Sequence, residues 1–350
     1  MRLNVEEIDA YGFDRRRIRR LELGRRARRI GDGAFSCCPL LEEVAISEGL
    51  ESVGRYVFQD SPRIRELRLP STLVEIPDDA FFFGSDGTIE RFVVHPDNPA
   101  YRSVDGVLFT KDMRKLVQFP QMKDTSCYVV PDTVETIADS AFSYAVRLER
   151  IDLPEGLRTI GSGAFEWCES LRSVRIPEGV GAVPMYAFFC CYALEEVALP
   201  ERLEALGSES FANCTSLKEF DIPPGFDQLD YAVLGGCDSL ERVSVPEGIA
   251  DVNNSAFLDC PRLRSVRLPS TVVAIWEKAF QRCSRLEEIN IPPEVYHVSE
   301  DAFQGCDGLR RIYVEGDLET KHWVPEGAEV ICGSPPPLSG DDRSKPFLIL

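Results

Sequence analysis

Phenylalanine recurs every 23 residues along most of this chain, and no other feature of the sequence limits the possible folds as strongly. It stands at positions 35, 58 and 81, then at 142, 165, 188 and 211, then at 257, 280 and 303, with Leu234 in the one vacant slot. An apolar residue five positions earlier and a cysteine three positions later keep the same step. A unit this short cannot bury its own apolar edge, so successive copies must stack into a solenoid.

A single unit, residues 171–191, predicts a strand followed by a return segment. Val174 and Ile176 alternate with polar neighbours, which is the period of a strand. Pro177 ends that strand because it has no N–H to donate to a ladder. The segment around Ala187 and Phe188 is expected to form one short helical turn on the opposite side of the coil.

The repeated pattern L-x-x-V-x-L-P-x-x-L-x-x-I-G-x-x-A-F-x-x-C-x-x-L resembles the BspA-like class of leucine-rich repeats. The resemblance covers residues 18–315. It implies a right-handed superhelix with a parallel sheet on the concave face and short helical or 3-10 turns on the convex side. It also implies a protein-binding role, since members of this class are often surface proteins of bacteria or protists that bind host or partner proteins.

Interruptions of the period suggest the domain organisation. Residues 1–17 are expected to form an N-terminal cap, residues 18–315 a solenoid of about 13 turns, and residues 316–350 a C-terminal cap with a loose tail. One unit carries 13 extra residues. Asp105-Gly106 lies there between alternating apolar residues and predicts a hairpin, with a small two- or three-stranded flap projecting from the solenoid at about 95–124.

Eight of the twelve cysteines form one column with the 23-residue step: Cys38, Cys168, Cys191, Cys214, Cys237, Cys260, Cys283 and Cys306. Stacked cysteines could form disulfides or bind a metal. Side chains in one column point in parallel, however, and no C-x-x-C pair is present, which favours buried free thiols. No metal or cofactor is therefore expected. Cys127 should point outward from a strand and is the strongest candidate for a reactive thiol.

The residue after each strand-start position nearly alternates between cation and anion, as in Arg19, Glu42, Arg65 and Glu90. Opposite charges on adjacent strands stabilise a sheet, and a concave repeat surface is a common binding face. The outward residues at the strand centres, together with two aromatics of the insertion, are the predicted partner contacts. They are Arg68, Val93, Val129, Asp152, Arg175, Asp221, Arg267, Asn290, Tyr313, Tyr101 and Phe109.

An arginine-rich stretch near the N-terminus offers an alternative function. Residues 1–29 hold ten arginines and five acidic residues, a net +5 in a chain whose formal net charge is −19. Such a patch could bind an anion or nucleic acid, or could pair with acidic residues of the same chain. The candidate residues are Arg15, Arg16, Arg17, Arg19, Arg20, Arg25, Arg26, Arg28 and Arg29.

No catalytic motif was found, and the three histidines are far apart in the repeat register. The sequence therefore predicts a non-enzymatic scaffold for an unidentified protein partner, acting as a monomer. The acidic net charge argues against nucleic acid as the main ligand. No apolar run is long enough to span a membrane. The absence of a signal segment and the free thiols favour the cytoplasm, whereas the resemblance favours the cell surface.

Overall fold

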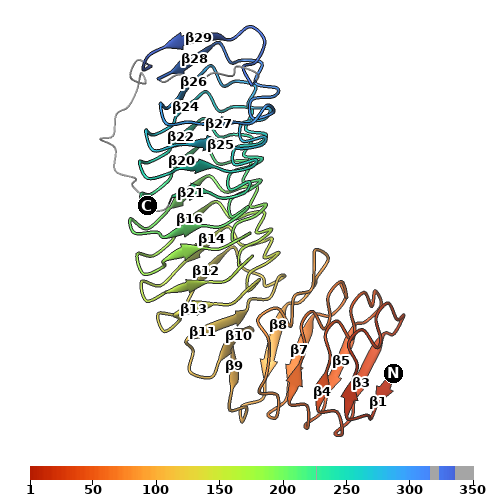
Figure 1. Cartoon of the computed structure of the whole chain (residues 1–350). Coiled ribbons are helices and arrows are strands. Elements are labelled where there is room, and N and C mark those ends of the chain that lie inside the picture. The colour runs from red at the N-terminus through yellow and green to blue at the C-terminus, as the bar shows by residue number, and fades with distance from the viewer. Residues whose placement is uncertain (226, 316–322, 336–350) are drawn as a thin grey trace.

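The computed structural model describes residues 1–225, 227–315 and 323–335. These residues form a parallel β-solenoid of about 14 turns. Figure 1 shows the coils stacked in two blocks whose axes diverge where β9 and β10 lie. We call residues 1–94 the N-terminal stack and the described residues from 125 onward the C-terminal stack.

Each regular coil contributes one strand to a long-strand face and a second, two-residue strand to a short-strand face. The long-strand face consists of β1 (Arg2–Leu3), β3 (Arg20–Leu23), β5 (Glu43–Ile46), β7 (Glu66–Leu69), β8 (Arg91–Val94), β12 (Cys127–Val129), β14 (Arg150–Asp152), β16 (Ser173–Arg175), β18 (Glu196–Ala198), β20 (Glu219–Asp221), β22 (Arg242–Ser244), β24 (Ser265–Arg267), β26 (Glu288–Ile291), β28 (Arg311–Val314) and β29 (Glu329–Cys332). The short-strand face consists of β2 (Glu7–Ile8), β4 (Arg29–Ile30), β6 (Ser52–Val53), β13 (Thr136–Ile137), β15 (Thr159–Ile160), β17 (Ala182–Val183), β19 (Ala205–Leu206), β21 (Gln228–Leu229), β23 (Asp251–Val252), β25 (Ala274–Ile275) and β27 (His297–Val298). Val174 pairs with Val197, so the parallel register of the strands equals the sequence period.

The third side of each coil, which we call the turn side, is not helical. No α-helix or 3-10 helix occurs among the described residues, so the expected helical turn is wrong. Residues four apart adopt left-handed backbone, as at Ser140 (φ 53°) and Tyr144 (φ 59°). The Tyr144 N–H donates to the carbonyl of Glu166 in the next coil, at 2.9 Å. Because these N–H groups bond between coils, they are not available for the bonds within one segment that would make a helix.

The phenylalanine column is buried throughout, as the period predicts. Phe165, Phe188 and Phe211 are fully buried, and their rings stack with centroids 5.0 and 5.1 Å apart. Leu234 fills its slot and is also fully buried. Burying each such side chain contributes roughly 1.5–3 kcal/mol, which makes this column a principal part of the core.

The insertion contributes three antiparallel strands, β9 (Tyr101–Val104), β10 (Val107–Thr110) and β11 (Lys115–Gln118). They belong to a five-stranded sheet, because β11 also pairs in parallel with β13 of the short-strand face. Asp105 and Gly106 both have positive φ, at 49° and 80°, and form the predicted hairpin turn. The expected projecting flap is wrong, because β10 and β11 lie inside the molecule. Their side chains alternate between two separate cores: Phe109 packs in the core of the C-terminal stack, and Leu108 packs in that of the N-terminal stack. We call this element the dividing sheet.

The two ends differ from each other. Residues 1–17, expected as a cap, carry β1 and β2, which pair in parallel with β3 and β4 and so form a first coil. At the other end β29 pairs with β28, and the Trp323 ring packs against Phe303 with centroids 5.8 Å apart. Trp323 thereby covers the last coil of the core. Residues 316–322 and 336–350, which include the expected loose tail, lie outside the described residues.

Candidate functional site

The cysteine column is a ladder of buried free thiols, as the sequence predicts. Each thiol donates to a main-chain oxygen that lies 26 residues earlier, or 25 residues earlier in the case of Cys38. Cys168 bonds to Phe142, Cys191 to Phe165, and both contacts are 3.2 Å long. The other members repeat this contact: Cys38, Cys214, Cys237, Cys260, Cys283 and Cys306.

The environment of these thiols makes them chemically inert. Burial raises the pKa of Cys168 and of Cys260 to about 12, so the reactive thiolate is absent at neutral pH. No group of metal-ligating residues occurs within the part of the chain that the structure describes. Cys127, by contrast, is exposed on β12, as expected. The ladder is therefore structural, and it has a counterpart in Ser61, whose hydroxyl donates to the carbonyl of Phe35 at 2.8 Å.

The alternating charges on the long-strand face form ion pairs between adjacent coils. Arg19 bonds to Glu42 at 3.1 Å, and Arg65 bonds to Glu90 at 3.0 Å. Arg172 lies between two carboxylates, 3.8 Å from Glu149 and 3.4 Å from Glu195. These pairs are solvent-exposed and contribute little stability individually, roughly 0–1 kcal/mol each. They hold the charged side chains in a fixed pattern on the surface.

The structure divides the predicted partner contacts into accessible and buried residues. Arg68, Val129, Arg175 and Asp221 are exposed on the long-strand face, and Val93, Asp152 and Arg267 are half-buried there.

Four predicted contacts are wrong, because the folded chain buries them. Phe109 is fully buried in the dividing sheet, and Tyr101 is buried with its hydroxyl oxygen accepting the Ile76 N–H at 3.1 Å. Tyr313 is 5% exposed. Asn290 accepts a hydrogen bond from the Leu268 N–H and donates to the Leu268 carbonyl, both at 2.8 Å, so its amide clamps two coils together.

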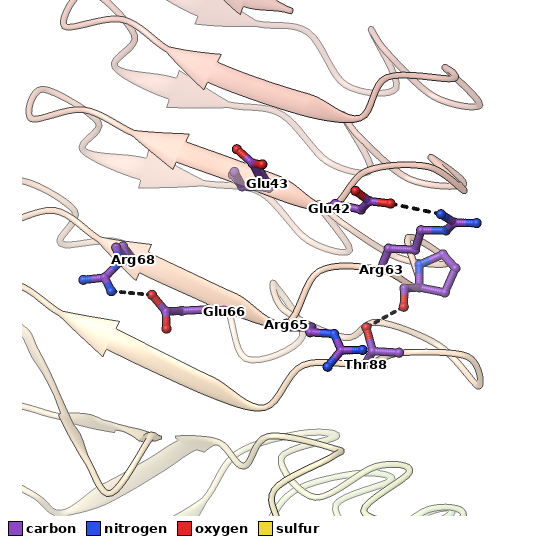
Figure 2. A pocket seen from close by; sticks show the side chains of 9 residues that line it. Glu42, Glu43, Arg63, Arg65, Glu66, Arg68 and Thr88 are labelled. Atoms are coloured by element: carbon purple, nitrogen blue, oxygen red, sulfur yellow. Dashed lines mark hydrogen bonds and ion pairs between the residues drawn. The ribbon is translucent and has the colours of Figure 1, made fainter.

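A shallow groove of about 660 Å³ lies on the long-strand face of the N-terminal stack. It is lined by Glu42, Glu43, Val44, Pro62, Arg63, Arg65, Glu66, Arg68 and Thr88. Figure 2 shows Arg68 directed at Glu66 and Arg63 directed at Glu42, at 2.6 and 3.0 Å. The groove therefore presents cations and anions side by side, in positions set by contacts within and between coils.

The arginine-rich stretch is folded as part of the first coils, and most of it is neutralised. Five of its arginines pair with acids of the same chain at 3.0–3.7 Å: Arg15 with Asp14, Arg19 with Glu42, Arg20 with Glu43, Arg28 with Glu51 and Arg29 with Glu7. Arg16, Arg17, Arg25 and Arg26 are exposed. They lie in two groups, before and after β3, and the anion-binding role of this stretch stays a prediction.

The structure shows one further surface feature that the sequence analysis did not predict. Half-buried aromatic side chains run along the turn side across successive coils, and we call them the aromatic band: Tyr56, Phe82, Tyr144, Trp167, Tyr186, Phe189 and Tyr192. The Tyr144 and Trp167 rings are stacked with centroids 5.7 Å apart. Trp167 also contacts Phe189 and Tyr192 edge-on, at 5.9 and 5.7 Å. Tyr144 and Trp167 are 23 residues apart and share one column of the repeat, but the other rings come from other columns, so the period does not predict the band as a whole.

Comparison with known proteins establishes the family. The family profile described as the BspA type leucine-rich repeat region matches residues 1–88, 118–237 and 231–321, in six copies. The chain belongs to the BspA-type leucine-rich repeat family. No protein with a curated description matches it.

Solved structures show the same fold around this BspA-type chain. A leucine-rich repeat protein from Eubacterium ventriosum is 23% identical with a TM-score of 0.62, over 93% of this chain and 85% of its own. The pneumococcal vaccine antigen PcpA is 20% identical with a TM-score of 0.56, over 94% and 77%. A Bacteroides ovatus leucine-rich repeat protein is 22% identical with a TM-score of 0.50, over 88% of each chain.

Nothing among residues 1–225, 227–315 and 323–335 of this BspA-type protein forms a helix that could traverse a lipid bilayer. The eight thiols of the ladder are a weak indicator of compartment, because they are buried and donate their hydrogens to main-chain oxygens. Burial shields them from oxidants in any compartment.

Proposed function

We propose that this chain is a non-enzymatic scaffold that binds a protein partner through the long-strand face of the N-terminal stack. The observation that carries the proposal is the charged groove lined by residues of β5, of β7 and of the segments that precede β7 and β8. Glu66 accepts ion pairs from both Arg68 and Arg91, and Glu42 accepts them from both Arg19 and Arg63. A partner then meets a preformed charge pattern and need not order these long side chains itself.

The pattern suits recognition by complementary charge. The groove is open and lined mainly by charged side chains, so it offers no apolar pocket for a small molecule. Alternating charges repel a partner whose pattern is out of register, which provides specificity more than affinity. A protein surface with its own alternating charges is the ligand that such a groove fits.

We further propose that the protein acts at the cell surface. The same fold occurs in a pneumococcal vaccine antigen, and the BspA-type family resemblance points the same way. The cytoplasmic location that the thiols favoured has no support from these relatives. Action as a monomer and indifference to nucleic acid stay predictions.

The test is affinity capture with full-length protein, followed by mass spectrometry. The Arg68→Glu variant inverts one charge in the groove. Arg175→Glu is its matched control, because it makes the same charge change at an exposed, ion-paired residue of the same face in the C-terminal stack. A specific partner should be captured by the wild type and by Arg175→Glu and lost with Arg68→Glu. Equal capture by all three proteins would show that the groove is not the binding site.

A further inference from the structure

The aromatic band is continuous across both stacks. Tyr56 contacts Phe82 edge-on at 6.1 Å, and Phe82 contacts Tyr144 at 6.0 Å, which joins the N-terminal stack to the C-terminal stack on the turn side. From Tyr144 the band continues to Trp167 and on to Phe189. A run of half-exposed aromatic rings over several coils is the kind of surface that protein interfaces use, because each ring buries a large area with little loss of conformational freedom.

Carboxylates surround this band. Glu166, Glu169 and Asp60 lie close enough to Tyr144 to contribute, after burial, to raising its pKa to about 12. Glu209 acts in the same way on Tyr186. Within the part of the chain described, no ion pair reaches any of these four acids. Glu166 is half-buried, and this burial raises the pKa of its carboxyl group, while a hydrogen bond from the Trp167 side chain lowers it.

We propose that the aromatic band is a docking surface for an arginine-rich polypeptide segment. A guanidinium group can stack on an aromatic face and bond to a carboxylate with the same planar group, so it matches both features of the band. A phosphate or other anion would be repelled by the four acids. The band runs across several coils as an exposed surface, which fits an extended chain with several cations better than a single small ligand.

This surface is distinct from the groove of the proposed function, because it lies on the turn side and not on the long-strand face. The two proposals can therefore fail independently. An arginine-rich ligand that binds the band leaves the Arg68 groove free, and charge inversion at Arg68 should leave binding to the band unchanged.

The probe is a fluorescently labelled peptide of ten arginines, with binding to the full-length protein followed by fluorescence anisotropy in physiological salt. Two variants remove different parts of the surface: Trp167→Ala removes the central ring, and Glu166→Gln with Glu169→Gln removes two charges. Each should weaken binding by about tenfold or more. A peptide of ten lysines should bind less tightly than the arginine peptide, since ammonium groups do not stack as guanidinium groups do.

Matched controls separate the band from the overall negative charge. Glu294→Gln with Glu300→Gln removes two exposed charges elsewhere, and Tyr296→Ala removes an exposed aromatic ring elsewhere. Both controls should stay within about twofold of the wild type. Equal weakening by the controls and by the two-glutamate variant, which keeps every ring of the band, would overturn the proposal. So would sedimentation at low salt showing that the wild type self-associates and Trp167→Ala does not, because the occupant would then be a second copy.

Discussion

The N-terminal and C-terminal stacks are built from the same coil, but their internal columns are packed differently. In the C-terminal stack Phe142, Phe165 and Phe188 stack at a constant 5.0 Å. In the N-terminal stack the ring of Phe35 lies 6.0 Å from that of Phe58, which in turn stacks on Phe83 at 6.4 Å. The rings of the N-terminal stack are therefore spaced more widely, and Phe58 stacks on Phe83 although the 23-residue period places Phe81 next.

The column beside the phenylalanines shows the same contrast. The C-terminal stack has seven consecutive thiols, from Cys168 to Cys306. The N-terminal stack has Cys38, then Ser61, then Gly84. Ser61 makes the contact that Cys168 makes, to a phenylalanine carbonyl 26 residues earlier. A hydroxyl can thus replace a thiol as the donor at this position, and Gly84 shows that the fold also accepts a residue with no side-chain donor there.

Alkaline pH should produce the largest difference in stability between the two stacks, because it destabilises the C-terminal stack more. The pKa of Cys168 and Cys260 is raised to about 12 in the folded state, so these thiols stay protonated there while unfolded thiols ionise near pH 9. The stability that this provides is complete below pH 9 and is lost as pH rises toward 12. Each thiol whose pKa is raised should cost about 1.4 kcal/mol per pH unit above 9, and burial raises the pKa of six consecutive thiols in the C-terminal stack, from Cys168 to Cys283.

This effect can be measured by urea unfolding at pH 7.5 and pH 10. All three tryptophans, Trp167, Trp276 and Trp323, belong to the C-terminal stack, so their fluorescence reports that stack alone, whereas circular dichroism reports the whole chain. From pH 7.5 to pH 10, the urea midpoint of the fluorescence transition, which reports the C-terminal stack, should fall steeply. A transition that appears only in circular dichroism, and so belongs to the N-terminal stack, should shift far less. Equal losses in both would mean that the thiol ladder is not the cause.

The Phe109→Ala substitution should have the largest effect of any single change. It opens a cavity in the dividing sheet, where β10 separates the two cores, and should cost about 3–5 kcal/mol. It should also uncouple the stacks, so that fluorescence and circular dichroism give different unfolding midpoints. Phe13→Ala serves as the control, since Phe13 is only half-buried and stacks on Phe35 in the first coils, away from the dividing sheet. A single coincident transition in the Phe109 variant would contradict the division into two cores.

Exchanging the side-chain hydrogen-bond donors of the two stacks, a thiol for a hydroxyl, should change the free energy of unfolding moderately. Cys214→Ser keeps a donor to the Phe188 carbonyl and should cost about 1 kcal/mol, whereas Cys214→Ala leaves that oxygen without the thiol hydrogen and should cost more. Ser61→Cys should change stability by less than about 1 kcal/mol. Chemical denaturation measures all three. A more stable Cys214→Ala than Cys214→Ser would show that volume matters here and the hydrogen bond does not.

The smallest effect is expected at the exposed ion pairs. Arg172→Gln removes contacts to Glu149 and Glu195 in the C-terminal stack, and it should cost no more than about 1 kcal/mol because solvent screens all three charges. Arg65→Gln is the equivalent change in the N-terminal stack and should have a similar effect. A loss of several kcal/mol at either site would mean that these pairs, and not the buried columns, hold the coils together.

The sequence by itself determined the features that repeat. The 23-residue step predicted the parallel register, the burial of Phe165 and Leu234, and the free thiols of the cysteine column. It succeeded because each of these positions contacts its own equivalent in the next coil, so one period encodes the contact. The Asp105-Gly106 hairpin was predicted for a local reason, since both residues readily adopt the left-handed backbone of a tight turn.

Only the tertiary structure decided what depends on residues that are not equivalent. The turns are not helical because the Tyr144 N–H has a partner in the adjacent coil, which the local sequence cannot show. The dividing sheet is internal because its two sides meet two different cores, and Asn290 is buried because its amide clamps a neighbouring coil. Tyr144 and Trp167 share one position, but the aromatic band as a whole draws its rings from different positions of the coils, so it exists only once the coils are stacked.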